Sequence, residues 1–161
     1  MALLRGHGIG AVADVRRYPR SRRNPQFNLE ALRESLAAAG IRLESFAAAL
    51  GGRRRARRDS PNEGWEMAGF RGYADHMASD VFVSGLEALE VLGGPTPTAI
   101  MCAESDWRRC HRRLIADALT ARCWRVLHIG ARGEIVEHQM TPFAVADAGR
   151  VWYPAIQQPL A

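Results

Sequence analysis

Apolar residues along the chain gather in short blocks that predict strands and helices in alternation. GIGAVADV (8–15) is a compact apolar run in which isoleucine and valine recur, typical of a buried strand that ends at Asp14 and Val15. Later runs of the same kind favour further strands. The expected strands cover residues 8–15, 41–46, 98–102, 125–129 and 134–138.

Between these strands, apolar residues at helical spacing predict helices. In the first helix Leu29, Leu32 and Leu36 share one face, Asn28 suits the N-cap, and Gly40 suits the residue that ends the helix. The expected helices cover residues 29–39, 71–77, 80–92 and 109–121.

This alternation indicates an α/β fold, a three-layer sandwich with a mainly parallel central sheet and Rossmann-like or flavodoxin-like topology. In such sheets ligands collect outside the carboxyl ends of the strands. Asp14 and Arg16 follow one strand end, and Cys102 and Glu104 follow another. We therefore expect both groups, with the segment as far as Arg112, to share one polar crevice.

The composition narrows the class of protein. With 161 residues, of which 47% are hydrophobic, the chain is expected to form one domain over residues 1–161, with an irregular tail from about residue 139. No apolar run has the length of a membrane span and no signal-peptide pattern opens the chain, so we expect a cytoplasmic protein without a membrane partner. An odd number of cysteines, 3, argues against a disulfide framework.

The net charge of +5 permits an anionic partner without identifying it. All 22 basic residues are arginine, a choice typical of a GC-rich genome, which weakens any argument from their number. Because the charge permits an anionic partner, the alternative to an enzyme is a nucleic-acid-binding module. In this alternative the loops 16–25 and 53–58 contact phosphates. The Arg53–Arg58 run is otherwise interpreted as a solvated loop.

The segment AIMCAESDWRRCHRR (99–113) brings together groups that act as nucleophiles, acids and bases. The first turn of the helix expected over residues 109–121 favours thiolates and bound anions. Cys102 is the candidate nucleophile, and Cys110, placed within that turn, is expected to be the more acidic thiol. Glu104 and His111 are the candidate acid and base.

Other interpretations of this segment stay open. The spacing from Cys102 to Arg108 suits a phosphate-cradling loop, but the loop contains two acidic residues and no glycine. Zinc binding by Cys102, Cys110 and His111 would need a fourth ligand from elsewhere, so neither a metal nor a cofactor is predicted. Both thiols are otherwise structural, as we expect for Cys123.

The remaining histidines carry little signal. His128 lies in an apolar strand and is interpreted as a core residue. The sequence identifies no partner for His7, His76 or His138.

Four ordered motifs resemble the uncharacterised family DUF488. They are ADVRRYPRSRRNPQFNLEAL (13–32), LGG (50–52), GFRGYADHM (69–77) and MCAESDWRRCHRRLIADAL…VLHI (101–129). The resemblance covers nearly the whole chain from Gly8 to Ile129 and implies an α/β fold with a polar pocket, without an established reaction. The family's hallmarks match Asp14-Val15-Arg16, Pro19, Ser21, Phe27, Gly72-Tyr73-Ala74, Cys102-Ala103-Glu104 and Cys110-His111-Arg112.

We therefore expect an enzyme, or a degenerate one, that binds or acts on a small anionic or nucleotide-like ligand. The expected catalytic residues are Cys102, Glu104 and His111. The expected ligand-binding residues are Asp14, Arg16, Ser21, Tyr73, Cys110 and Arg112.

The opening of the chain departs from the family. Its members begin with a strand carrying a Gly-His motif and then a helix, whereas ALLRGHGIG (2–10) looks like the end of that helix. An uncovered strand edge and self-association into a homo-oligomer are expected to follow.

Overall fold

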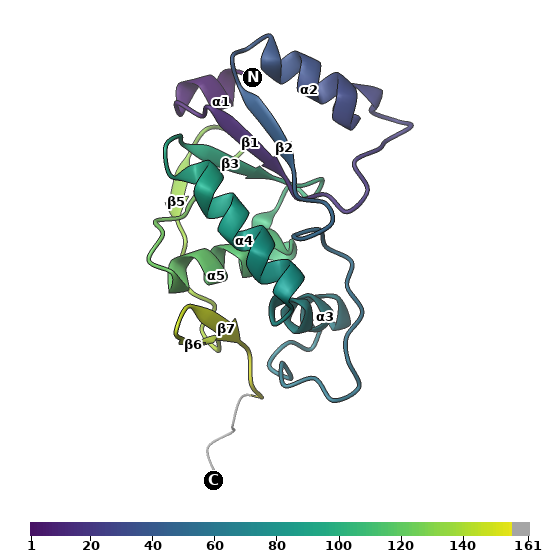
Figure 1. Cartoon of the computed structure of the whole chain (residues 1–161), viewed down its shortest axis with the longest axis vertical. Coiled ribbons are helices and arrows are strands. Elements are labelled where there is room, and N and C mark those ends of the chain that lie inside the picture. Colours follow the sequence, from purple (N-terminus) through teal and green to yellow (C-terminus); the bar gives the residue numbers. More distant parts are fainter. Residues whose placement is uncertain (156–161) are drawn as a thin grey trace. The chain divides into compact units, whose positions relative to one another are not determined.

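The computed structural model describes residues 1–155, and the chain folds into two compact units (Figure 1). Unit 1 comprises residues 1–52 and 84–105, and unit 2 comprises residues 53–83 and those from 106 onward. The expectation of one domain over residues 1–161 stays a prediction. Among the described residues, no helix has both the length and the apolar character needed to cross a bilayer.

Unit 1 is built on a parallel sheet. Its elements are α1 (Ala2–Gly6), β1 (Ala11–Asp14), the 3-10 turn η1 (Pro25–Phe27), α2 (Leu29–Ala37), β2 (Arg42–Ser45), the later part of α4 (Asp80–Gly93) and β3 (Thr98–Met101). The strand order is β2-β1-β3, and both strand pairs are parallel. The predicted α/β class with a parallel sheet is therefore confirmed.

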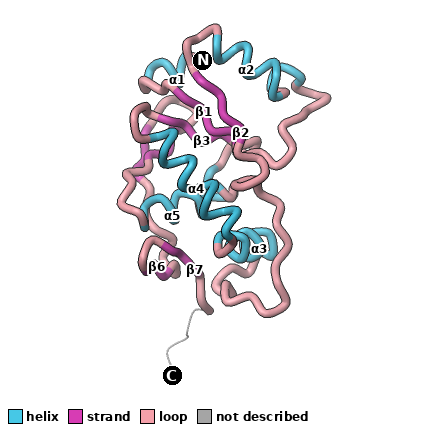
Figure 2. Tube along the Cα trace, in the orientation of Figure 1, coloured by secondary structure: helices cyan, strands magenta, loops and turns pink. Residues whose placement is uncertain are grey.

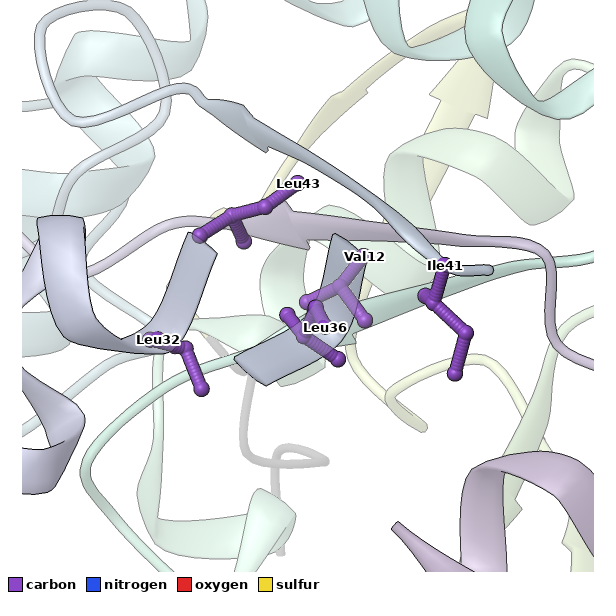
Figure 3. Packing of buried hydrophobic residues seen from close by; sticks show 5 residues of the cluster. All are labelled: Val12, Leu32, Leu36, Ile41 and Leu43. Carbon is purple, nitrogen blue, oxygen red and sulfur yellow. The ribbon is translucent and has the colours of Figure 1, made fainter. Parts of the chain in front are cut away.

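Helix α2 covers the sheet through one apolar face. Leu32 and Leu36 are four residues apart, so both point to the same side of the helix, where they join Val12, Ile41 and Leu43 in one buried cluster (Figure 3). Val12 and Leu43 are opposite each other in the β1–β2 register. Burying each leucine contributes about 1.5–3 kcal/mol, which attaches α2 to the sheet.

The ends of α2 differ slightly from the prediction. The helix ends at Ala37, and Gly40 closes the turn with a φ of +73° that other residues rarely adopt. Asn28 is the N-cap residue, but its side chain does not cap the helix. Its Oδ1 instead accepts the amide N–H of Ser21 at 2.7 Å, which fixes the loop before the helix.

Unit 2 contains short elements around an aromatic core. They are α3 (Ala68–Met77), the start of α4, the 3-10 turn η2 (Trp107–Arg109), α5 (Arg112–Ala121), and the strands β4 (Leu127–Ile129), β5 (Ile135–Glu137), β6 (Val145–Asp147) and β7 (Arg150–Trp152). The ring of Trp65 lies 4.6 Å from that of Phe70, 5.0 Å from that of Phe143 and 5.4 Å from that of Tyr153, measured between centroids. Figure 2 shows how much of the chain between β2 and α3 is loop.

Two expectations about the later strands are wrong. The strand expected at 125–129 does not join the parallel sheet, because β4 pairs antiparallel with β5 in a sheet of two strands. The tail expected to be irregular from residue 139 contains the β6–β7 hairpin, whose turn places Ala148 and Gly149 at positive φ. These strands are three residues long, too short to produce an alternating pattern. Residues 156–161 of that tail lie outside the described residues.

Candidate functional site

Asp14 and Cys102 occupy neighbouring positions at the carboxyl edge of the parallel sheet. Asp14 is opposite Met101 in the register of β1 and β3, and the amide of Val15 donates to the Met101 carbonyl at 3.0 Å. Cys102 follows Met101 directly. The prediction that two strand ends bring Asp14 beside the start of the cysteine segment is confirmed, whereas the wider crevice that includes Cys110, His111 and Arg112 stays a prediction.

Asp14 and Arg16 form a buried, bidentate ion pair. The Nε of Arg16 donates to Oδ1 of Asp14 at 2.8 Å, Nη2 donates to Oδ2 at 2.6 Å, and the Arg16 amide also donates to Oδ1 at 3.0 Å. The remaining guanidinium nitrogen, Nη1, donates to the carbonyl of Phe27 at 2.8 Å. The pair therefore ties the loop before α2 to the end of β1. A role for either residue in binding a ligand stays a prediction.

Ser21 takes part in the same loop. Its Oγ accepts the amide N–H of Asn24 at 3.0 Å, which stabilises the turn that leads into η1. In the segment after β3, Cys102 is half-buried and Glu104 is exposed. The roles expected for Ser21, Cys102 and Glu104 stay predictions.

The helix expected from Arg109 begins three residues later, at Arg112. The side chain of Asp106 accepts the amide N–H of Arg108 at 3.0 Å and so starts the separate turn η2. After this turn Cys110 is extended, with φ of −121° and ψ of 149°. The expectation that Cys110 lies within the first helical turn is therefore wrong.

Cys110 is buried between the two residues that follow it. Cys110 is only 4% exposed, and its Sγ accepts the Nε–H of Arg112 at 3.4 Å. The Nδ1 of His111 lies 3.6 Å from the same sulfur. The ring of His111 also lies 4.9 Å from that of the buried Tyr73. Within unit 2 the structure thus brings together four of the predicted site residues.

Unit 2 also contains a hydrogen-bonded group that the sequence did not identify. Asp117, on α5, is fully buried and accepts three hydrogen bonds. The donors are the amide of Thr141 at 2.9 Å, the hydroxyl of Tyr153 at 2.8 Å and the Nε2 of His138 at 2.8 Å. Burial and the neighbouring carboxylate raise the pKa of Tyr153, so its hydroxyl stays a neutral donor.

The group extends from His138 to His128. The Nδ1 of His138 lies 2.9 Å from the Nε2 of His128, whose ring stacks on Trp107 at 3.6 Å with an angle of 2° between the planes. Burial, then His138, Arg112 and Arg108, lower the pKa of His128 from 6.5 to about 4, so His128 is neutral near pH 7. The interpretation of His128 as a core residue therefore needs correction, because the residue is half-buried and hydrogen-bonded.

Pairing across the β4–β5 sheet explains why this group was missed. His128 is opposite Val136, two residues before His138, and β5 ends just before His138. Only a prediction of this register would have placed the two rings together. Asp117 gave no signal either, since a lone aspartate in an apolar helix carries no motif.

The arginine-rich loop of unit 2 is attached to α3. The Oδ2 of Asp75 accepts the amide of Arg57 at 2.8 Å, and Ser60 and Asn62 donate to its Oδ1. A Cβ at Gly72 would lie 2.4 Å from the Arg54 carbonyl oxygen, so the loop backbone packs directly on the helix. Most arginine side chains of the loop are exposed, which fits the solvated loop expected for Arg53–Arg58.

An open groove lies in unit 1. It has a volume of about 420 Å³ and runs beside β2 and the later part of α4, where Phe46, Val91 and Leu92 line it. The polar residues Arg42 and Glu44 complete its rim. None of the candidate site residues lines this groove, so it does not alter the choice of site.

The parallel sheet defines an α/β protein, and in unit 2 the buried Cys110 is in contact with the half-buried His111 and Arg112. The family model described as Domain of unknown function DUF488 matches residues 1–119, and the chain belongs to this family. No curated protein and no solved structure matched the chain. The family match confirms the resemblance in the motifs and ends before His128 and His138.

Proposed function

We propose that this DUF488 protein is an enzyme that binds a small anionic or nucleotide-like ligand beside a reactive thiol at Cys110. The contact that carries the proposal is the hydrogen bond from Arg112 Nε to Cys110 Sγ at 3.4 Å. A guanidinium favours the thiolate over the thiol, and an N–H at His111 Nδ1, 3.6 Å away, acts in the same direction. The N-terminus of α5, which begins at Arg112, adds a partial positive charge.

The proposal gives each residue a role. Cys110 is the nucleophile in this proposal, because Arg112 and the imidazole of His111 both contact its sulfur. His111 is the acid or base next to it, and Arg112 binds the negative charge of the ligand. Tyr73 packs against the His111 ring and orients it.

The remaining predicted residues belong to the proposal in a supporting role. Asp14, Arg16 and Ser21 shape the loop at the sheet edge, and Cys102 and Glu104 follow β3 at that same edge. The three-layer arrangement of helices around the sheet is part of the proposal as well.

Alkylation of each cysteine as a function of pH tests the reactive thiol. Iodoacetamide followed by peptide mass spectrometry gives a rate for Cys102, Cys110 and the exposed Cys123, which serves as the internal control. The midpoint of the rate profile reports the thiolate fraction independently of access. We expect the Cys110 midpoint at least about one pH unit below that of Cys123, because neighbouring cations lower thiol pKa values by one unit or more.

Two variants distinguish the effect of the Arg112–Cys110 contact on the thiol from the effect of the other positive charges nearby. Arg112→Gln should move the Cys110 midpoint toward that of Cys123, whereas Arg109→Gln, which removes an exposed positive charge nearby, should leave it in place. Inorganic phosphate should slow alkylation of Cys110 in the wild type and not in Arg112→Gln. A Cys110 midpoint equal to that of Cys123 contradicts the proposal, and a low midpoint at Cys102 assigns the nucleophile to Cys102.

A further inference from the structure

Asp117, His138 and His128 form a chain of hydrogen bonds. The positions of the protons along it follow from Asp117, its buried end. The carboxylate of Asp117 only accepts, so the Nε2 of His138, 2.8 Å away, carries a proton. In a neutral His138 the Nδ1 is then an acceptor, and the Nε2 of His128 at 2.9 Å must be the donor. This leaves the Nδ1 of His128 as an acceptor, and among residues 1–155 it has no hydrogen-bond partner.

We propose that Asp117, His138 and His128 form a proton relay, in which His128 is a catalytic acid–base residue and the other two are positioning residues. His128 accepts a proton at Nδ1 from a ligand, while its Nε2 proton moves to the Nδ1 of His138. One proton enters and one crosses the 2.9 Å contact, so His128 ends neutral and His138 ends positively charged beside Asp117. The reverse sequence returns the proton to the ligand.

The charges around the two rings determine where the positive charge stays. His138 and Asp117 are fully buried, so the carboxylate at 2.8 Å is a strong local stabiliser of a histidinium. His128 is influenced instead by Arg112, at the start of α5, and by Arg108, in η2. Burial, then His138 and these two cations, disfavour a positive charge on His128 and lower its pKa to about 4. The relay thus separates the point of proton entry from the place where charge is held.

The surroundings of His128 also indicate the class of ligand. Trp107 covers one face of its ring at 3.6 Å, which fixes the plane in which Nδ1 accepts. Arg108 lies over the Trp107 ring, with its Cζ 4.6 Å from the centroid. A cationic ligand would be repelled here, whereas the conjugate base of a weak oxygen acid would be stabilised. The fitting ligand is therefore an acidic hydroxyl, such as that of a protonated phosphate.

This inference does not rest on the proposed function: the two share Arg112, but the relay uses neither Cys110 nor His111. Ring ¹⁵N chemical shifts of the intact protein test it, because they report the tautomer and charge of each histidine. Near pH 7 we expect His128 and His138 both to be protonated at Nε2. In His128→Gln, which removes the donor to His138, the Nδ1 signal of His138 should shift.

Two results would overturn the relay. A wild-type His128 protonated at Nδ1 instead of Nε2 contradicts the direction of transfer, and a His138 Nδ1 signal that is identical in the wild type and in His128→Gln contradicts the coupling. His128 is half-buried, so this variant is expected to fold.

Inorganic phosphate tests the ligand class in the same spectra. At pH 6, where phosphate is mainly the dihydrogen form, its addition should shift the ring signals of His128 and increase the charge on His138. In His128→Gln the response of His138 should be lost. Spectra that phosphate leaves unchanged would overturn the assignment of an acidic oxyanion as the ligand, independently of the alkylation of Cys110.

Discussion

Each unit of the protein buries one carboxylate that accepts three hydrogen bonds. The two carboxylates differ in the residues that donate these bonds. Asp14 in unit 1 receives all three from Arg16, whereas Asp117 in unit 2 receives them from Thr141, Tyr153 and His138. Both aspartates have no exposed surface. The same residue type in the same degree of burial is therefore held by a permanent cation in one unit and by neutral or titratable donors in the other.

The difference separates a structural carboxylate from a responsive one. An arginine keeps its proton at every pH that a folded protein meets, so the Asp14–Arg16 pair has one charge state to hold the loop before α2. A histidine ring is neutral or positively charged according to whether it carries one or two protons, so His138 can present either charge state to Asp117. A buried carboxylate thus suggests a chemical role when its hydrogen-bond donor can gain or lose a proton.

The largest expected effect follows from breaking the ion pair between Asp14 and Arg16. Asp14→Asn leaves the Arg16 guanidinium buried without a counter-charge, and we expect a loss of about 3–5 kcal/mol in the free energy of unfolding, measured with urea. Asp59→Asn removes the exposed partner of Arg57 and is the matched control, with no measurable change expected. Equal stabilities of Asp14→Asn and the wild type would show that the pair does not hold the loop.

A smaller loss is expected at the other carboxylate. Asp117→Asn weakens the contacts with Thr141, Tyr153 and His138, but no permanent cation is left behind, because His138 can remain neutral. We expect a loss of about 1.5–3 kcal/mol at pH 8, as for hydrogen bonds to a charged group. Urea unfolding of both variants under identical conditions gives the comparison. A larger loss in the free energy of unfolding for Asp117→Asn than for Asp14→Asn would contradict the distinction between a carboxylate held by a permanent cation and one held by neutral donors.

The smallest effect is a dependence on pH that belongs to unit 2. The unfolded chain protonates His128 near its ordinary pKa of 6.5, whereas in the folded protein this pKa is about 4. Between these values the unfolded chain binds more protons, so the contribution of His128 to stability is complete above pH 6.5 and declines as the pH falls toward 4. His128→Gln should therefore lose less stability than the wild type between pH 7 and 4.5. Parallel urea midpoints for the two proteins over this range would contradict the assigned shift.

Local patterns in the sequence were sufficient for the sheet of unit 1. The apolar run that ends at Asp14 predicted β1, and the spacing of Leu32 and Leu36 predicted the face of α2 that packs on the sheet. Asp14 and Cys102 could be placed together because strand ends in a parallel sheet share an edge. These inferences depend on the periodicity of neighbouring residues, which the sequence states directly.

Local patterns were not sufficient where a single side chain redirected the backbone. The amide of Arg108 bonds to Asp106, so η2 forms and α5 starts only at Arg112, which leaves Cys110 extended. The residue types favoured a helix that starts at Arg109, whereas a side-chain cap of this kind, worth about 1 kcal/mol, favours the separate turn η2. The family motifs marked the segment as important without indicating where its helix begins.

The sequence by itself determined the α/β class, the parallel strands and the family, because each depends on repeated local signals along many residues. Only the tertiary structure decided which polar side chains meet. His128 and His138 come together through the β4–β5 pairing, and Asp117 and Tyr153 meet although 36 positions separate them. A hydrogen bond depends on distances of a few tenths of an ångström between residues distant in sequence, and no spacing along the chain encodes such a distance.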